Sequence, residues 1–417
     1  MPSPCPMPIA ALVAALLAIG ACSAPAPATP DDRGSLPADD GPRLRIEAAA
    51  DALHQTLRRR GLLLRAPAVN AEVGSVVSRL TAAASADNPP IRPYVLKNPM
   101  VNAMALPNGN IYLNSGLIAT LENEAQLAAI IAHEINHVWS EDSLQEHARA
   151  KDTITAANIA DILLLGLANV GAQATLAGYS REQEEAADLA GLRLFAAAGY
   201  EVSEFANAYA LMAELPEYAM DKGSIFSSHP EQWRRVAYLR AAVDRDYAGA
   251  VGQGTVNSSA YAPLRSQLLE LSIQLRLQAR LPAMALDTLE RGEPLLSNPA
   301  LGAYYRGEAS RAMADHPREA ARERSLIAHG RVSDRYEAAL SAQVPAHYDE
   351  AIASYRQALA LDPDLLVAHR GLGLALHARG RDDEARPHLS RYLDQPAPPD
   401  DARYIQRLLN NLSGTTP

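Results

Sequence analysis

Two histidines four residues apart, with a glutamate directly after the first, are the residues of this chain best suited to chemistry. They are His133, Glu134 and His137, in the stretch AIIAHEINHVWSED. On a helix, residues i and i+4 project from the same face about one turn apart. Two imidazoles placed in this way can share one metal ion, and the glutamate can reach water that the metal activates without itself binding the metal. The pattern therefore predicts a catalytic zinc site.

A catalytic zinc ion takes three protein ligands and keeps one position for water. The stretch YSREQEEAADLAG supplies a candidate third ligand in Glu184, with Asp188 four residues later on the same helix face. We expect Glu184 to complete the site and Asp188 to accept the free ring N–H of a ligand histidine. Glu185 is a rival ligand. These acids also fit the ordinary, solvated first turn of a helix.

Capping signals predict the two helices that position these residues. Asn123 can cap a helix that carries the histidines, and Glu124 suits the positive end of its dipole. Ser180, with Gln183 three residues later, forms a capping-box pattern that predicts a second helix running through Phe195. The candidate ligands are thus expected on two separate helices.

Helical and β-like segments flank these two helices. Residues 44–87 are expected to be helical, whereas IRPYVLKN and NAMALPNGNIYLN alternate as strands do. Asn108-Gly109 between alternating runs predicts a hairpin. Residues 154–178 are apolar but contain Asp161, and an acid inside a bilayer is costly. We expect that segment to be a buried helix or a flap over the site, with attachment to a lipid surface as an open alternative.

From about residue 260 the chain becomes rich in Leu, Ala and Arg, and an internal repeat appears. The triplet Asp-Glu-Ala at 349–351 recurs at 383–385, after 34 residues, which is the period of the tetratricopeptide repeat. The sequence predicts two to four helical hairpins over residues 260–413. A generic helical bundle is the alternative.

The N-terminal residues are typical of an exported protein. An apolar run too short to span a bilayer ends in IGAC, residues 19–22, which resembles a bacterial lipobox. The first eight residues contain no Lys or Arg, unlike most signal peptides. We expect a signal peptide over 1–21, lipidation of Cys22 and a disordered tether over 22–43, with an ordinary cleaved signal peptide as the alternative. The other cysteine, Cys5, lies in the segment that would be removed.

Length and charge restrict the function further. The chain has 417 residues, which favours two or three domains. Its formal net charge of -10 and the absence of long Lys/Arg tracts exclude an electrostatic surface for nucleic acid.

Three motifs in this order resemble the zinc metallopeptidase family that includes the CAAX prenyl protease and HtpX: His133-Glu134-x-x-His137, Glu184-x-x-x-Asp188, and SSHPEQWRRV with His229 and Arg235. The resemblance covers roughly residues 45–245. It implies an α+β, mostly helical fold, with a gluzincin-type zinc metallopeptidase domain over 44–250 followed by a tetratricopeptide-repeat-like helical domain over 260–413.

The resemblance also implies roles for single residues. One zinc ion per chain would lie on His133, His137 and Glu184, with Glu134 as general base and Arg235 holding Asp188. The strand at 110–114 would be the sheet edge that receives the substrate. His229 would either occupy the fourth metal position and keep the enzyme latent, or donate a hydrogen bond to the oxyanion. A histidine that merely caps the turn before Pro230 is the plain structural alternative.

The exported N-terminus and the added repeats are most similar to the beta-barrel assembly-enhancing proteases within that family. This implies a zinc endopeptidase in the periplasm, anchored to the outer membrane by lipid. It would degrade unfolded or misassembled outer-membrane proteins, and a role in aiding their assembly is also implied. The repeat domain would bind either the outer-membrane assembly machinery or the substrate. The alternative is a periplasmic tetratricopeptide scaffold or chaperone with a structural or silent metal site. Glu134 favours the enzyme, because a structural site has no use for a base beside its ligand.

Overall fold

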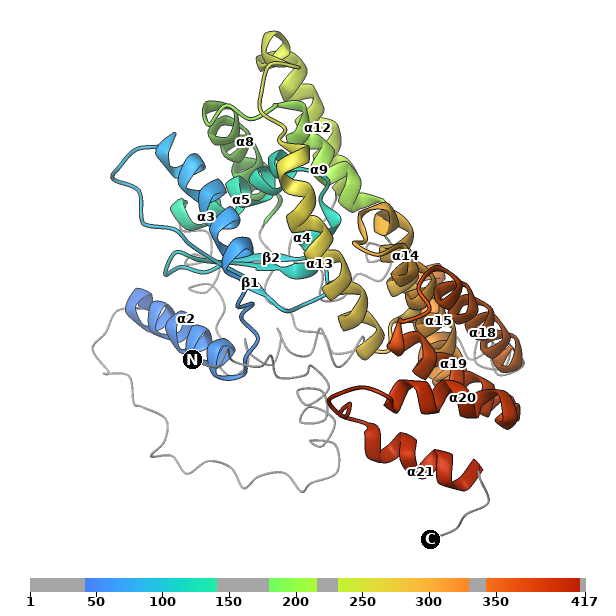
Figure 1. The fold of residues 1–417 in the computed structure, drawn as a ribbon. Coiled ribbons are helices and arrows are strands. Elements are labelled where there is room, and N and C mark those ends of the chain that lie inside the picture. Colours follow the sequence, from blue (N-terminus) through green and yellow to red (C-terminus); the bar gives the residue numbers. More distant parts are fainter. Residues whose placement is uncertain (1–41, 141–179, 216–231, 330–342, 413–417) are drawn as a thin grey trace, which may run out of the picture. The chain divides into compact units, whose positions relative to one another are not determined.

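The computed structural model describes residues 42–140, 180–215, 232–329 and 343–412 (Figure 1). The predicted signal peptide, Cys22, the segment 154–178 and His229 lie outside these residues. The described chain is mostly helical with one small sheet, so the predicted fold class is confirmed. Two compact units are present, one formed by residues 40–297 and 318–340 and the other mainly by 298–317 and 341–417. The domain limits expected from the sequence, 44–250 and 260–413, stay a prediction.

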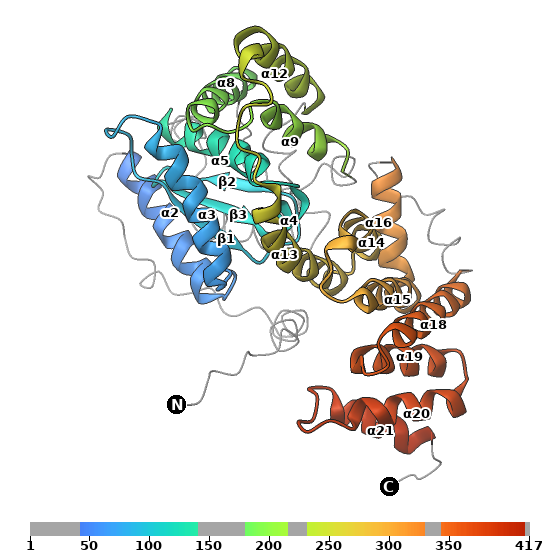
Figure 2. The same ribbon diagram turned by 45° about the horizontal axis from the view of Figure 1, so that its top comes forward.

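The first unit contains the sheet and most of the helices (Figures 1 and 2). Its elements are α2 (Pro42–Arg59), α3 (Pro67–Ala82), β1 (Arg92–Leu96), β2 (Ala103–Ala105), β3 (Asn110–Asn114), α4 (Ser115–Thr120), α5 (Glu124–Trp139), α8 (Arg181–Ala197), α9 (Ser203–Ala213), α12 (Gln232–Asp246), α13 (Ser258–Gln278), α14 (Pro282–Gly292) and α16 (Pro317–His329). Among the described residues, none of the helices combines the length and the apolar character that crossing a membrane requires.

The three strands form a sheet of order β1-β3-β2. Strands β2 and β3 pair antiparallel, which confirms the hairpin at 108–109, and Gly109 there has a φ of +84° that suits glycine. Strand β1 joins the other side of β3 in parallel. The prediction that 110–114 is an edge strand is therefore wrong, because β3 is paired on both sides. The edges of the sheet are β1 and β2.

The two faces of the sheet bury different helices, because successive side chains of a strand point to opposite faces. Ile111 and Leu113 of β3 join the core formed with α3 and α5. Tyr112, between them, packs with Leu53 and Leu57 of α2. Helix α5 is buried along nearly its whole length, which explains why its sequence is apolar on almost every face.

The second unit is helical and carries the repeat. It contains α15 (Pro299–Asp315), α18 (Val344–Leu361), α19 (Leu366–Ala378), α20 (Asp382–Leu393) and α21 (Ala402–Leu412). Ala351 and Ala385, which recur at the 34-residue period, are both fully buried on α18 and α20. Gly307 and Gly371 face the buried ring of Tyr355, where an added Cβ would lie 2.7 and 2.4 Å from ring atoms. Small residues thus let neighbouring helices of the repeat approach closely.

Candidate metal centre

Helix α5 presents both histidines in one direction. His133 and His137 are 1% and 0% exposed, and their Nε2 atoms lie 3.0 Å apart. The helix begins as the sequence predicts, since the Asn123 side chain accepts a hydrogen bond of 2.8 Å from the Gln126 N–H. Glu124 is buried in the first turn and accepts a hydrogen bond from the Tyr200 hydroxyl. The start of α5, and with it the histidine pair, is therefore fixed by several polar contacts.

Helix α8 brings a carboxylate against this pair. Ser180 and Gln183 form both hydrogen bonds of a capping box at its start. Helix α8 packs on α5, and an added Cβ on Gly191 would lie 3.2 Å from the His133 backbone nitrogen. Because Gly191 has no side chain, the two helices approach closely enough for the Glu184 carboxylate to reach both imidazoles.

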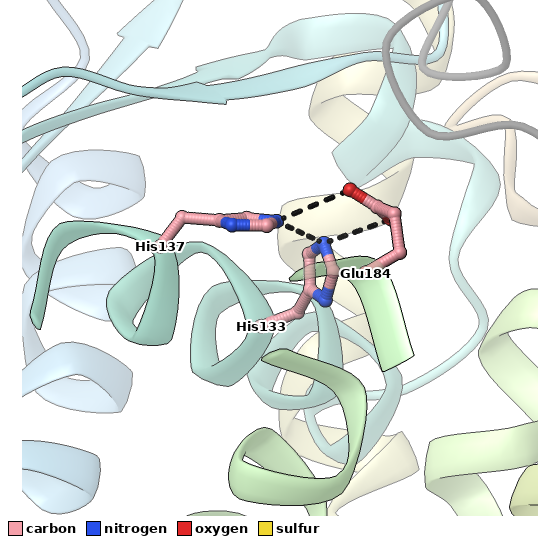
Figure 3. Close-up of side chains that lie close together, drawn as sticks. All are labelled: His133, His137 and Glu184. Carbon is pink, nitrogen blue, oxygen red and sulfur yellow. Dashed lines mark hydrogen bonds and ion pairs between the residues drawn. The ribbon is translucent and has the colours of Figure 1, made fainter. Parts of the chain in front are cut away.

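The three candidate ligands converge from these two helices, as Figure 3 shows. Glu184 Oε1 lies 3.4 Å from His137 Nε2, and Glu184 Oε2 lies 3.7 Å from His133 Nε2. Tetrahedral zinc with bonds of about 2.0–2.1 Å places its ligand atoms about 3.3 Å from one another. The distances of 3.0, 3.4 and 3.7 Å bracket that value, and two imidazoles with one carboxylate are a donor set of catalytic zinc. The residues therefore fit a zinc ion.

The two neighbouring glutamates of α8 have different environments. Glu184 is 4% exposed and belongs to the group that could hold a metal, with His133 and His137. The Glu185 side chain is 48% exposed and lies 3.8 Å from Arg234. A step of one residue rotates a side chain by about 100° around a helix, so only one of the two can face α5. The rival ligand Glu185 is thus turned to solvent.

Asp188 connects the histidines to α12. Its Oδ1 lies 2.9 Å from His133 Nδ1, so this carboxylate can accept the ring N–H and leave Nε2 free to bind a metal. Arg235 of α12 donates to both Asp188 oxygens at 2.6 and 2.8 Å, and its Nη1 lies 2.9 Å from Glu184 Oε2. Tyr238 also donates to Asp188. The carboxylate that orients His133 is therefore itself held from a third helix.

The electrostatics of the group favour neutral imidazole beside ionised carboxylate. Burial, with the nearby His137 and Arg235, lowers the pKa of His133 to about 4. Burial opposes ionisation of Asp188, but the Arg235 guanidinium and the His133 N–H hold its pKa well below the usual range. A neutral histidine can offer its lone pair to a metal, so these states suit the ligand and partner roles.

Of the two candidate catalytic residues, Glu134 and His229, the structure describes only Glu134. Glu134 is fully buried on α5, directly after the ligand His133. His229 lies outside the described residues, so the structure gives no position for it.

Sequence reasoning missed two tyrosines near the centre. Tyr238 follows Arg235 by three residues, and this helical spacing could have indicated a shared face. Tyr209 of α9 is 1% exposed, and the Arg235 guanidinium lies 4.5 Å from its ring centroid. Its position among the apolar residues of α9 is typical of a core aromatic, so the sequence carried no signal for it. Both tyrosines help to enclose the Asp188–Arg235 pair in protein.

Strand β2 is a further element that the sequence did not single out. It packs against α5, and its Ala103 and Ala105 are 3% and 5% exposed. Backbone hydrogen bonds join residue 102 to 114 and residue 106 to 110, so the N–H and C=O groups of Met104, midway between them, also point toward β3. The N–H and C=O groups of Ala103 and Ala105 therefore point to the outer edge of the sheet. The Asn102 Oδ1 atom is buried and has no hydrogen-bond partner within the described part of the chain.

Comparison with known proteins agrees with this geometry. Residues 67–243 match the model of peptidase family M48, and residues 347–380 match that of a TPR repeat. The chain is 29% identical to the putative beta-barrel assembly-enhancing protease of Vibrio cholerae, over 47% of this chain and 46% of that protein. It is 27% identical to the beta-barrel assembly-enhancing protease of Yersinia pestis, over 53% and 50%.

A mitochondrial protein is also similar to part of this chain. The mitochondrial metalloendopeptidase OMA1 of Schizosaccharomyces pombe is 29% identical over 39% of this chain and 50% of its own length. The chain thus spans about half the length of the curated relatives that it matches. The residues of the metal centre that the structure brings together lie within the matched peptidase region. The chain therefore carries a region that matches a metallopeptidase family and a second region that matches a tetratricopeptide repeat.

Proposed function

We propose that this protein is a zinc-dependent endopeptidase with His133, His137 and Glu184 as the zinc ligands. The observation that carries the proposal is the convergence of these three donors at separations close to those of tetrahedral zinc. A carboxylic acid, Glu134, follows the first ligand on the same buried helix. A purely structural zinc site has four protein ligands and needs no such acid.

The bound zinc would supply Lewis-acid chemistry, activating water and polarising a peptide carbonyl. Glu134 acts as general base: it takes a proton from the attacking water and returns it to the leaving amine. Asp188 keeps His133 in the tautomer whose Nε2 faces the metal, and Arg235 keeps Asp188 ionised and in place.

The substrate would lie along β2. The outer N–H and C=O groups of Ala103 and Ala105 can pair with an extended peptide, and the unpartnered Asn102 Oδ1 can accept one of its N–H groups. Main-chain pairing reads backbone rather than side chains, so the sequence preference would be weak and the substrates extended or unfolded. Both alanines are buried in this conformation, so the protein must open before a peptide can bind.

In the cell, we place this activity in the bacterial envelope. The predicted signal peptide and lipidated Cys22 support export and outer-membrane anchoring, and two relatives bear the name beta-barrel assembly-enhancing protease. Misfolded or misassembled outer-membrane proteins are the proposed substrates. The TPR repeat at 347–380 is a candidate contact for the assembly machinery.

The test combines zinc content with casein hydrolysis for the wild type and three variants. Glu184→Ala should lose zinc and activity together. Glu134→Gln should keep zinc and lose about 10²–10⁴-fold in rate, the usual contribution of a general base. Glu185→Gln, at the exposed neighbouring position, should behave as wild type. No zinc in the supplemented wild type, or full activity of Glu134→Gln, would contradict the proposal and favour a scaffold with a silent site.

We also propose that His229 keeps the enzyme latent. The burial of the ligands and of β2 supports a resting state that substrate cannot enter. Casein digestion by His229→Ala should then exceed that of wild type. Lower activity of the variant would instead mean that His229 assists turnover, as an oxyanion partner would.

A further inference from the structure

Helix α13 begins at Ser258, beyond the matched peptidase region, yet it touches the segment that leads into β2. That segment, residues 97–102, carries the chain from β1 on one edge of the sheet to β2 on the other. Strand β2 has only three residues, so its own ladder bonds are few. Its position therefore depends on how the preceding segment is held.

One anchor of the segment is the start of α4. The Ser115 hydroxyl donates to the Asn98 carbonyl at 2.9 Å, and the Gly116 N–H donates to the same oxygen at 2.9 Å. Gly116 also packs so closely that an added Cβ would lie 2.0 Å from the Pro99 oxygen. This anchor fixes Asn98, and the Asn98 Oδ1 atom accepts a hydrogen bond of 3.0 Å from the Met100 N–H. The Pro99 carbonyl between them is held from another helix.

The second anchor comes from α13. Arg276 is 2% exposed, and its Nη2 donates to the Pro99 carbonyl at 3.0 Å. Its Nη1 donates to the Met284 carbonyl of α14 at 3.4 Å. Proline has no N–H, so its carbonyl is the one polar backbone group with which residue 99 can be tied. Hydrogen bonds from a charged donor are stronger than those between neutral groups.

Helices α14 and α16 support this guanidinium. Glu323 of α16 accepts hydrogen bonds from the Ala283 and Met284 N–H groups at 2.9 and 2.8 Å, and so fixes the start of α14. Met100, the residue after Pro99, is 4% exposed and packs in one apolar cluster with Leu281, Met284 and Leu326. Pro99 and Met100 are thus enclosed by three helices that lie outside the peptidase-family match.

We propose that Arg276 is a positioning residue for substrate: by tying the Pro99 carbonyl to α13 and α14, it holds β2 in the place where a peptide adds to its edge. The inference rests on the proposed function, in which β2 receives the substrate. It assigns a role in peptide binding to a helix that the peptidase-family match does not include. Within the described residues, the hydrogen bonds of Arg276 go to Pro99 and Met284, and not to the metal ligands or Glu134.

Kinetics separate this role from a general contribution to folding. A loosened β2 weakens the binding of substrate and transition state alike, which raises KM and leaves kcat unchanged. A merely structural defect lowers the fraction of active enzyme, which reduces kcat and leaves KM unchanged. A positioning role therefore changes KM, whereas a merely structural role changes kcat.

The experiment compares Arg276→Met with Arg280→Met in the full chain, loaded with zinc. Arg280 lies just after the same helix and bonds Glu319 of α16 at 2.5 Å, but the residues that it contacts do not include the 97–102 segment. We expect KM for an extended peptide to rise roughly tenfold in Arg276→Met, the effect of losing one charged hydrogen bond, and to stay at the wild-type value in the control. Zinc content should be unchanged in both. Arg276→Lys, which keeps the charge but offers one nitrogen in place of the two that now bond, should lie between them.

Hydrogen–deuterium exchange supplies a readout that needs no activity. Amides of residues 97–106 should exchange faster in Arg276→Met and at the wild-type rate in Arg280→Met. Equal KM and equal exchange in the two variants would overturn the proposal, as would a lowered kcat with unchanged KM. If Arg276→Met fails to fold, Arg276→Lys decides by the same criteria. If the zinc-loaded wild type cleaves no peptide, the proposed function fails, and the exchange rates alone decide whether Arg276 holds β2.

Discussion

Replacing Asp188 by asparagine tests how far the zinc site depends on residues that do not touch the metal. Asp188 is fully buried and accepts hydrogen bonds from His133 Nδ1, from two nitrogens of Arg235 and from Tyr238. Asparagine has nearly the same shape but carries no charge. Its amide nitrogen must also face at least one of these donors, because all the neighbours of the carboxylate donate hydrogen bonds.

The expected effects follow from these contacts. Loss of the partner that orients a ligand histidine typically costs 10- to 100-fold in metal affinity, or about 1.4–2.8 kcal/mol. Removing one member of a buried ion pair costs about 3–5 kcal/mol of stability, and we expect the lower end, because Arg235 Nη1 still lies 2.9 Å from Glu184. That remaining pairing draws the Glu184 carboxylate toward Arg235 and so further weakens zinc binding.

Zinc affinity can be measured by competition with a chromophoric chelator, and stability by urea unfolding of the metal-free protein. Glu185→Gln is the matched control, because it removes an exposed carboxylate from the same helix. The control should match wild type in both assays. If Asp188→Asn bound zinc within twofold of wild type, the reasoning that Asp188 orients His133 would be refuted.

Three other perturbations have defined outcomes. Gly191→Ala should lower the free energy of unfolding by about 1–3 kcal/mol and weaken zinc binding, because its Cβ would lie 3.2 Å from the His133 backbone nitrogen. The control Gly74→Ala, with open space around the new Cβ, should be neutral or stabilising. Urea unfolding and zinc competition compare the two variants. Burial raises the pKa of Glu323 from 4.5 to about 7. The free energy of unfolding of wild type minus that of Glu323→Gln should therefore fall from pH 4.5 to pH 7, by about 1.4 kcal/mol per pH unit at most, and should level off above pH 7. A difference that does not change with pH would contradict this. Removal of zinc by a chelator should lower the melting temperature of wild type but not that of Glu184→Ala. At a free zinc concentration of about 100 times the Kd, the bound ion contributes about 2.7 kcal/mol to the free energy of unfolding, and chelation removes this contribution.

The sequence by itself determined the local parts of the site. The spacing of His133 and His137 places both on one helix face, and the capping residues Asn123 and Ser180 locate the two helices. The 34-residue period predicted the repeat, and Asn108-Gly109 predicted the hairpin. Such features can be predicted because spacing, capping and turn rules involve residues close together in the chain.

The tertiary structure decided what depends on distant segments. A hairpin rule pairs β2 with β3 but cannot say that β1 occupies the other side, so the expectation that 110–114 is an edge strand is wrong. Likewise, the helix period says that Glu184 and Glu185 diverge, but only the packing of α8 on α5 determines which of them is buried. The Arg276–Pro99 contact joins residues 177 positions apart, and no local pattern marks it. Strand order and helix packing are set by the burial of apolar faces across the whole unit, which the spacing of neighbouring residues does not specify.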